Sequence, residues 1–279
     1  MEIEGTNIMQ KNNMERLHET LIEILDYVVS VCEENGLRYF LIYGSALGAY
    51  RHQGFIPWDD DLDIGLPRED YEKFLKIMEK QPSKLYCLQN DSTEDKYYLT
   101  FSKVRKQGTL FMESIAEGMY RDNGIFVDIF PLDYVTDKTS LGHKMKEYMI
   151  AYLNHTLRYA GYRNAYSKSS PIKHAIEHVI CLPAFVLPKK WIVNIIKRLN
   201  KGRCQEADAK YLVEYCDLRY RWAQPVEYYF PPKKMSFAGK EYNVPGQIES
   251  YLSATYGDDY MQLPPEEDRV THLPLELKF

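Results

Sequence analysis

Cysteine is scarce in this sequence, and the few cysteines form no motif. The 279 residues contain five of them, an odd number, scattered between Cys32 and Cys216 without a C-x-x-C pair or a Cys/His spacing that would suggest a zinc site. This usage argues against a disulfide framework and is typical of proteins in the reducing cytosol.

Long apolar runs are also missing. The longest run that could enter a membrane, residues 179–187, has about half of the roughly 20 residues that a spanning helix needs, and Pro183 interrupts it. The first 13 residues are polar and acidic, without the charged leader and apolar core of a signal peptide. We therefore expect a globular protein without a membrane-spanning helix, located in the cytoplasm.

Acidic residues are nearly absent from the middle of the chain. Residues 138–203 contain thirteen Lys or Arg but only two acids, Glu147 and Glu177, so this segment carries a charge of +11 although the whole chain carries −5. Such asymmetry favours an anionic partner, and residues 181–191 form an apolar stretch with lysines that suits a membrane interface. A solvated basic face is the alternative. We predict a peripheral contact of residues 171–203 with the inner face of a membrane.

Hydrophobic residues make up 45% of the chain, enough for one large domain or for a domain with a helical subdomain. Apolar residues at three- and four-residue spacing predict helices at 14–34 and 67–80. Long helical stretches are predicted from 140 to about 218, then a hairpin at 235–244 and a short helix at 246–257. Short aromatic and β-branched runs predict strands at 39–43, 61–66, 85–90, 97–106, 108–114 and 124–132.

Negative charge is concentrated in the segment PWDDDLDIG, residues 57–65, which contains four aspartates. Side chains alternate in a strand, so Asp61 and Asp63 point to one side, and the apolar residues beside them point into the core. Carboxylates this close raise each other's pKa unless a cation lies between them, and D-x-D oxygens suit Mg²⁺ or Mn²⁺. We predict Asp61 and Asp63 as metal ligands; a solvated acidic turn is the alternative.

A third acid, Asp128, lies inside the apolar strand pattern of residues 124–132. An unpaired carboxylate is costly to bury, so Asp128 needs a partner, and a metal shared with Asp61 and Asp63 would be one. The alternative is a position on the exposed face of an edge strand.

Gly44 and Ser45 lie between the first predicted strand and a helical stretch that follows it. Backbone amides and a hydroxyl at a helix N-terminus bind phosphate, although a Gly-Ser pair alone more often marks a plain turn. Together with the three carboxylates, the pair provides a phosphate-binding turn, a metal site and a base. These are the groups that phosphoryl or nucleotidyl transfer requires.

The segment YGSALGAYRHQGFIPWDDDLDIGLPREDYEKF, residues 43–74, resembles the signature of the LicD family of phosphotransferases. The relatives of this family include the fukutin-related proteins, and it belongs to the nucleotidyltransferase superfamily typified by DNA polymerase beta. The resemblance continues at 97–111, 124–133 and 244–269, and the basic middle of the chain is the least family-like part.

This resemblance implies an α+β fold whose mixed-sheet core is similar to that of polymerase beta, with a helical subdomain attached. On that basis we expect a catalytic core with an N-terminal helix at 1–137. A basic helical subdomain would follow at 138–230. Residues 231–279 would form a C-terminal hairpin and helix that pack back on the core.

The resemblance also implies a Mg²⁺-dependent enzyme that transfers a phospho-substituent, most often phosphocholine from CDP-choline, and releases CMP. The acceptor would be a hydroxyl of a cell-surface glycan, such as teichoic acid or lipopolysaccharide, or of its lipid-linked precursor; nucleic acid is not expected as a partner. In such enzymes the phosphate-binding turn matches Gly44 and Ser45. The metal carboxylates match Asp61 and Asp63, and the third carboxylate, a ligand or a base, matches Asp128.

Two cations and several aromatic residues complete the predicted site. Arg51 follows the Gly-Ser turn within two helical turns and Lys103 lies in a predicted strand, so both are candidates for phosphate contacts; ordinary surface cations are the alternative. A choline group would need aromatic faces, because a quaternary ammonium donates no hydrogen bonds. The candidates are Tyr97, Tyr98, Tyr211, Tyr215, Tyr220 and Trp222.

Two other functions stay open on the sequence. A nucleotidyltransferase that moves NMP from an NTP to a small molecule would use the same carboxylates. A glycan-binding module with a structural divalent metal and no turnover would also contain an aspartate cluster, but it would need no phosphate-binding turn.

Overall fold

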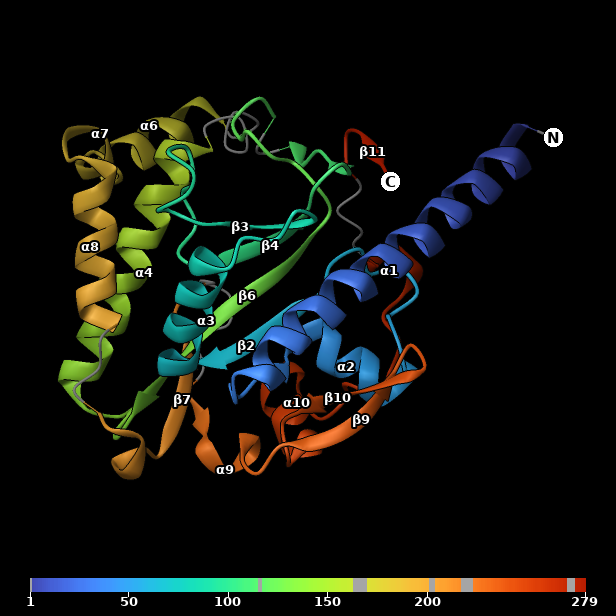
Figure 1. Cartoon of the computed structure of the whole chain (residues 1–279). Coiled ribbons are helices and arrows are strands. Elements are labelled where there is room, and N and C mark those ends of the chain that lie inside the picture. Colours follow the sequence, from blue (N-terminus) through green and yellow to red (C-terminus); the bar gives the residue numbers. More distant parts are fainter. Residues whose placement is uncertain (1, 115–116, 163–169, 201–203, 217–222, 270–273) are drawn as a thin grey trace.

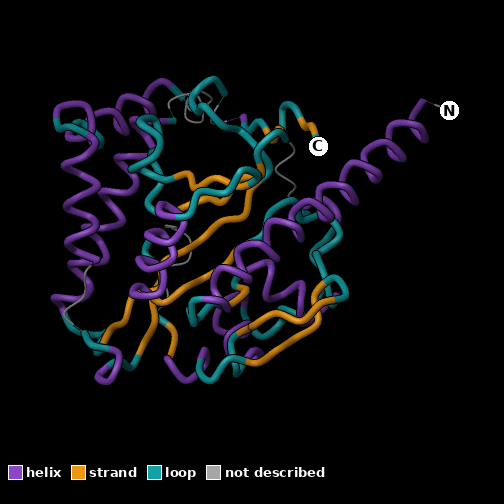
Figure 2. Tube along the Cα trace, viewed as in Figure 1, coloured by secondary structure: helices purple, strands orange, loops and turns teal. Residues whose placement is uncertain are grey.

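A seven-stranded mixed sheet forms the centre of the computed structural model (Figure 1, Figure 2). The structure describes residues 2–114, 117–162, 170–200, 204–216, 223–269 and 274–279. The strands of the sheet are β1 (Phe40–Leu41), β2 (Asp63–Pro67), β3 (Tyr86–Gln89), β4 (Ser102–Lys106), β6 (Phe126–Val135), β7 (Tyr211–Glu214) and β8 (Gln224–Pro225). Their order is β1-β2-β6-β4-β3, and β7 pairs with β6 and β8. Only the β2–β6 pair is parallel among these.

Two helices cover one face of the sheet. α1 (Glu2–Glu34) and α3 (Arg68–Lys80) pack on β6 and its neighbours, as Figure 1 shows. At the β1 edge, α2 (Tyr43–His52) packs against β2 and against α10 (Ile248–Tyr256). Next to them lie the hairpin of β9 (Lys233–Phe237) and β10 (Lys240–Val244) and the short helix α9 (Val226–Tyr229).

A second group of helices follows β6 and stands beside the sheet (Figure 1). It consists of α4 (Leu141–Gly161), α6 (Pro171–Ile180), α7 (Pro183–Val186) and α8 (Lys189–Asn200), with α7 and α8 both packed on α4. A small pair of β5 (Leu110–Phe111) and β11 (Leu277–Lys278) and two 3-10 turns, η2 (Glu206–Asp208) and η3 (Glu266–Asp268), complete the fold. In the described part of the chain, no helix combines the length and apolar character needed to cross a membrane.

Alternation along β6 separates the core from the functional face. All ten residues of this strand are buried, because it lies between β2 on one side and β4 and β7 on the other. Val127 and Ile129 are fully buried in the hydrophobic core on the face that α1 and α3 cover. Phe126, Asp128 and Phe130 point to the opposite face, where they line a cavity.

The structure confirms most of the predicted elements. The predicted strands correspond to β1 through β6, and the C-terminal hairpin and helix are present. The prediction of helix from 140 to about 218 was wrong at its end, because Leu212 and Val213 are buried in β7 and extend the central sheet. The division of the chain at 137 and 230 stays a prediction.

A buried ion pair joins α3 to the centre of the sheet. The Arg68 guanidinium donates from Nε to Asp133 Oδ1 at 2.9 Å and from Nη2 to Oδ2 at 2.6 Å. The Asp133 side chain is 3% exposed and that of Arg68 18%. The paired charges fix the start of α3 against the second half of β6.

Replacing Asp133 by Ala should lower the free energy of unfolding by about 3–5 kcal/mol, because it leaves the Arg68 charge buried without its partner. The double variant Arg68→Met/Asp133→Leu should lose less, since neither charge then needs compensation. Urea unfolding of the two variants and the wild type measures this. If both variants lose the same free energy of unfolding, the unpaired charge of Arg68 is not what destabilises the Asp133→Ala variant.

Candidate active site

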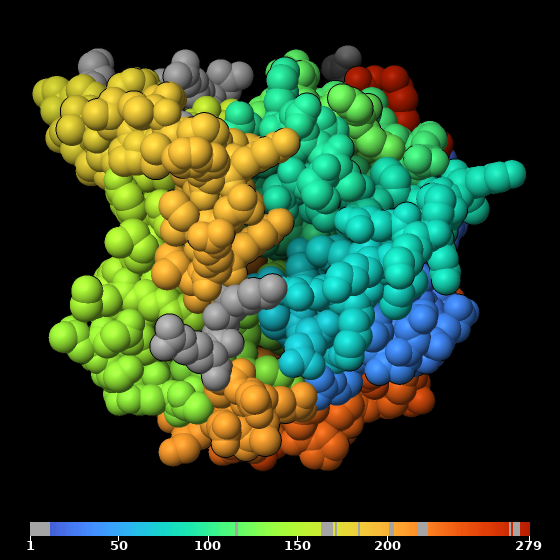
Figure 3. Space-filling view, turned by 60° about the vertical axis from the view of Figure 1, so that its left-hand side comes forward, coloured from blue at the N-terminus to red at the C-terminus, as the bar shows by residue number. Residues whose placement is uncertain are grey.

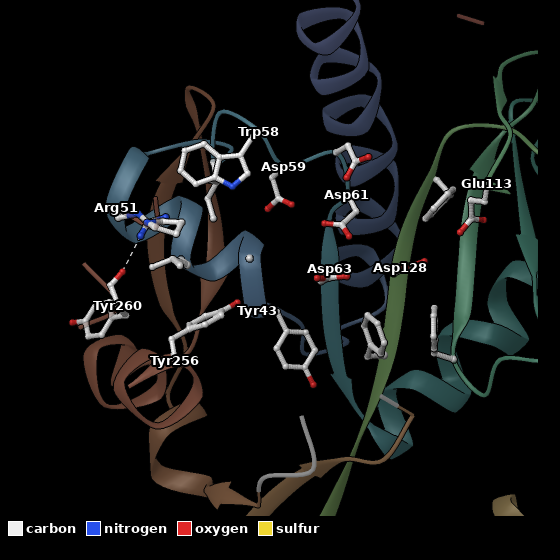
Figure 4. Close-up of a pocket in the computed structure, with 18 of the residues that line it drawn as sticks. Tyr43, Arg51, Trp58, Asp59, Asp61, Asp63, Glu113, Asp128, Tyr256 and Tyr260 are labelled. Carbon is white, nitrogen blue, oxygen red and sulfur yellow. Dashed lines mark hydrogen bonds between the residues drawn. The ribbon is translucent and has the colours of Figure 1, made fainter. Parts of the chain in front are cut away.

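A cavity of about 1020 Å³ opens on the sheet face opposite to α1 and α3 (Figure 4). Its floor is formed by side chains of β2, β4 and β6, and one wall by α2 and the loop that follows it. The C-terminal segment from Tyr256 to Pro265, Arg158 of α4, and residues of the segments 99–101 and 111–114 contribute the rest of the lining. The cavity therefore collects residues from both ends of the chain.

The predicted carboxylates meet in this cavity. The parallel register of β2 and β6 places Asp63 directly beside Asp128, so both side chains point to the same face. Asp61 lies two residues before the pair, and Figure 4 shows Asp59, Asp61 and Asp63 following one another along the cavity wall. The structure thus brings together the three acids that the sequence predicted.

Two further aspartates belong to the cluster. Asp59, Asp60 and Asp61 each offer one carboxylate oxygen, and these three atoms lie within 4.8 Å of one another. Sequence reasoning did not count Asp59 and Asp60 as site residues, because the predicted strand began at Asp61 and the preceding loop has no fixed period. In the structure β2 begins at Asp63, so Asp61 belongs to the same loop. The feature of the sequence that could have identified Asp59 and Asp60 is their position in the same acidic run as Asp61.

Burial and the charges of neighbouring acids raise the pKa values of Asp59, Asp63 and Asp128. Burial, followed by the negative charge of Asp61, raises the pKa of Asp59 to about 8. Burial and the charges of Asp61 and Asp128 raise the pKa of Asp63 well above its ordinary range. Burial raises the pKa of Asp128 to about 7 although Lys103 opposes the shift. Without a cation, the cluster therefore retains protons near neutral pH.

The donor set fits a hard divalent cation. The Asp128 Oδ1 atom is buried and has no hydrogen-bond partner, although Lys103 Nζ lies 3.3 Å away. Several carboxylate oxygens converge without sulfur or imidazole, which is the ligand chemistry that Mg²⁺ and Mn²⁺ prefer. Among the described residues, the acidic group whose oxygens lie close enough together to share one ion is Asp59, Asp60 and Asp61. The set that the sequence suggested, Asp61, Asp63 and Asp128, stays a prediction.

Lys103 is a buried charge held between two acids. Its Nζ lies 3.3 Å from Asp128 Oδ1 and 3.4 Å from Glu113 Oε1, and the side chain is 3% exposed. Burial would raise the pKa of Glu113, but Lys103 and Arg105 outweigh it and lower that pKa. Glu113 was not predicted, since it lies in a loop without a motif. Lys103 lines the cavity as expected, and its contact with phosphate stays a prediction.

Gly44 and Ser45 lie in the first turn of α2 instead of preceding the helix. A Cβ on Gly44 would lie 2.7 Å from Asp59 Oδ2, so glycine allows this carboxylate to approach the helix N-terminus. The Ser45 hydroxyl accepts a hydrogen bond from the Asp63 backbone amide at 2.8 Å. Gly44 lines the cavity, whereas Ser45 positions the strand that carries Asp63.

Arg51 connects α2 to the C-terminal segment. Its Nη1 donates to the carbonyl oxygens of Tyr260 at 2.9 Å and Gln262 at 3.2 Å, and Figure 4 shows the first of these bonds. Arg51 also lines the cavity. Its predicted contact with phosphate is not tested by this arrangement, which shows a role in assembling the cavity wall.

The aromatic residues of the cavity differ from those that the sequence suggested. Tyr97, Tyr98, Tyr211 and Tyr215 are not part of its lining, and Tyr220 and Trp222 lie outside the described residues. Sequence alone could not find the aromatic lining because tertiary contacts bring it together from six separate segments. These residues are Tyr43, Trp58, Phe101, Phe111, Phe126, Phe130, Tyr256 and Tyr260.

Comparison with known proteins adds a family to this geometry. The model of the LicD/FKTN/FKRP family, nucleotidyltransferase domain, matches residues 36–159. The chain is 27% identical over 279 residues to the lipopolysaccharide cholinephosphotransferase LicD of Haemophilus influenzae, an alignment that covers 95% of this chain and 97% of that protein. It is also 54% identical over 50 residues to human ribitol 5-phosphate transferase FKRP, covering 18% of this chain and 10% of FKRP.

The matched residues include the first turn of α2, the aspartate cluster, Lys103 and Asp128. Residues 36–159 therefore form a LicD-family domain, and the predictions of a LicD-like transferase and of a relationship to the fukutin-related proteins are confirmed.

Proposed function

We propose that this protein transfers phosphocholine from CDP-choline to a hydroxyl of a lipopolysaccharide-type glycan and releases CMP. The observation that carries the proposal is the pair of Asp63 and Asp128, held side by side in parallel strands and facing a cavity large enough for a nucleotide. Similarity to a lipopolysaccharide cholinephosphotransferase over nearly the whole chain supports the choice of donor and acceptor. On this proposal the central sheet is a polymerase beta-like core.

Asp61, Asp63 and Asp128 would hold Mg²⁺ or Mn²⁺ in this enzyme. A bound ion would neutralise the donor's phosphate oxygens and stabilise the charge that develops on them during transfer. The N-terminal turn of α2, at Gly44, would bind phosphate through its backbone amides. The acceptor hydroxyl would attack the β-phosphorus in line with the bond to CMP.

Asp128 has two available roles at this step. It can complete the metal site, or it can accept the proton of the acceptor hydroxyl, for which a pKa of about 7 is well suited at neutral pH. Lys103, only 3.3 Å away, favours the charged form of Asp128 in both roles.

The aromatic part of the cavity would receive the choline group. A quaternary ammonium binds to the faces of aromatic rings, and Trp58, Tyr256 and Tyr260 lie along the wall opposite to Asp128 in Figure 4. Phosphate would then lie over the aspartates and choline over the rings. A ribitol or glycerol donor would lack this attraction.

Thermal unfolding with a panel of CDP-linked donors and Mg²⁺ tests the donor. CDP-choline should stabilise the wild type more than CDP-ethanolamine, CDP-glycerol or CDP-ribitol, and the Asp61→Ala/Asp63→Ala variant should lose this stabilisation. Stabilisation by NTPs with release of pyrophosphate would instead support the nucleotidyltransferase alternative. High Ca²⁺ affinity without turnover would support a binding module.

Replacing Asp63 by Asn should lower the rate of CMP release on the order of 100-fold or more, because a metal site contributes several kcal/mol to transition-state stabilisation. The matched control is Asp208→Asn, which changes an exposed aspartate of η2 away from the cavity. The measurement is steady-state CMP release with saturating CDP-choline. Equal rates in both variants would contradict the assignment of Asp63.

The stability of the metal-free protein should fall as the pH rises. The pKa of Asp59 is raised to about 8 and that of Asp128 to about 7, compared with about 3.9 in an unfolded chain. The folded protein therefore binds more protons than the unfolded chain in this window, so its free energy of unfolding decreases with increasing pH. The melting temperature in chelator should fall from about pH 5 to about pH 8.

Added Mg²⁺ should raise the melting temperature more at the upper end of this range, because the ion competes with protons for the same oxygens. The Asp208→Asn control should behave like the wild type. A melting temperature in chelator that does not change across this range would contradict the raised pKa values.

A further inference from the structure

The group of helices after β6 exposes an unusual amount of apolar surface. Among the described residues, thirteen of the seventeen exposed large hydrophobic side chains lie between Leu141 and Ile195. Figure 3 shows α6 and α7, in yellow, projecting from the molecule at the upper left. We define the apolar face as Ile172, Ile176, Val179, Ile180, Leu182, Val186, Leu187 and Trp191.

Helix α6 turns its apolar side chains toward solvent, whereas an ordinary surface helix turns them toward the core. Its apolar stripe at positions 172, 176, 179 and 180 points to solvent, with Ile172 76% and Val179 74% exposed. A surface helix normally turns such a stripe to the core, so these side chains are placed for contact with something outside the chain.

The opposite stripe of α6 is held on the protein by polar contacts. His155 Nε2 lies 2.8 Å from Glu177 Oε2, and the Tyr159 hydroxyl lies 3.1 Å from His174 Nδ1. The Tyr152 hydroxyl donates to the Ile180 carbonyl at 2.9 Å. These bonds keep the apolar stripe facing outward instead of allowing the helix to rotate and bury it.

Charge identifies the partner that suits this face. Residues 138–203 contain only two acids, and both Glu147 and Glu177 lie against histidines. Exposed lysines at 173 and 190 flank the apolar residues. Lys189, by contrast, donates to the carbonyl oxygens of residues 94, 95 and 97. Lys197 is paired with Asp91. Apolar side chains with basic neighbours, in a segment whose two acids both lie against histidines, are typical of a segment that lies in an anionic membrane interface.

We propose that α6, α7 and the start of α8 dock this protein on the surface of an anionic lipid bilayer, with the apolar face inserted among the lipid headgroups. A second copy of the chain fits less well, because symmetric pairing of two such faces would bring like charges together. Arg158, which lines the cavity, is followed by Tyr159, which packs under α6. The docking surface therefore adjoins the cavity through the last turns of α4.

Flotation with vesicles tests this proposal and does not require turnover. The wild type should float with vesicles of phosphatidylglycerol and phosphatidylcholine, and less with phosphatidylcholine alone. The variant Ile176→Gln/Val179→Gln/Trp191→Gln should lose at least about tenfold in partitioning, because it removes apolar side chains that insert. The variant Lys173→Gln/Lys190→Gln should partition onto the anionic vesicles less strongly, by about fivefold for each lysine removed.

The matched control is Leu85→Gln/Leu275→Gln, which removes two exposed leucines, 59% and 58% exposed, outside the apolar face. This control should float like the wild type. The Asp63→Asn variant should also float, so a failure of the proposed chemistry is distinguishable from a failure of docking.

Absence of flotation with either kind of vesicle would overturn the proposal. Equal flotation of the wild type and the Ile176→Gln/Val179→Gln/Trp191→Gln variant would also overturn it. Sedimentation equilibrium adds one more outcome: a wild-type dimer that this variant converts to a monomer, without vesicle binding, would assign the apolar face to a second copy instead.

Discussion

The parallel pairing of β2 with β6 is the constraint on which the rest of the site depends. It places two carboxylates side by side on a buried strand face, an arrangement that is unfavourable without protons or a cation between them. Neighbouring residues offset this negative charge, fix the strand that carries it or leave space for it. Lys103 lies against Asp128, the Ser45 hydroxyl holds the amide of Asp63, and Gly44 leaves room for Asp59.

The buried cations beside the site show how the fold tolerates this arrangement. Lys103 and Arg105 are two residues apart on the cavity side of β4, and each forms an ion pair with Glu113. Arg105 also donates to Gln89 Oε1 at 2.7 Å and to the Gly124 carbonyl at 2.6 Å, so its charge is satisfied within the protein. A fixed positive charge thus lies next to the aspartates and offsets part of their negative charge.

Sequence reasoning succeeded where the signal is local. Strand alternation placed Asp63 and Asp128, and amphipathic spacing placed α3. Asp61 also lies in the cavity, but it precedes β2 instead of belonging to the strand as predicted. Sequence reasoning failed where tertiary contacts decide. Leu212 and Val213 form a strand because β6 offers an unpaired edge, and Glu113 joins the site only because a loop folds over β4. The aromatic lining could not be predicted, since no period or motif relates Trp58 to Tyr256.

Arg51 and Tyr43 of α2 are bonded to residues that are synthesised much later than α2. Arg51 is fixed by carbonyls of Tyr260 and Gln262, and the Tyr43 backbone amide donates to the Tyr251 hydroxyl at 3.0 Å. The aspartates at 59–63 are therefore made well before residues 251–262, to which α2 and the cavity wall are bonded. A growing chain has no enclosed site until this later segment has also been made.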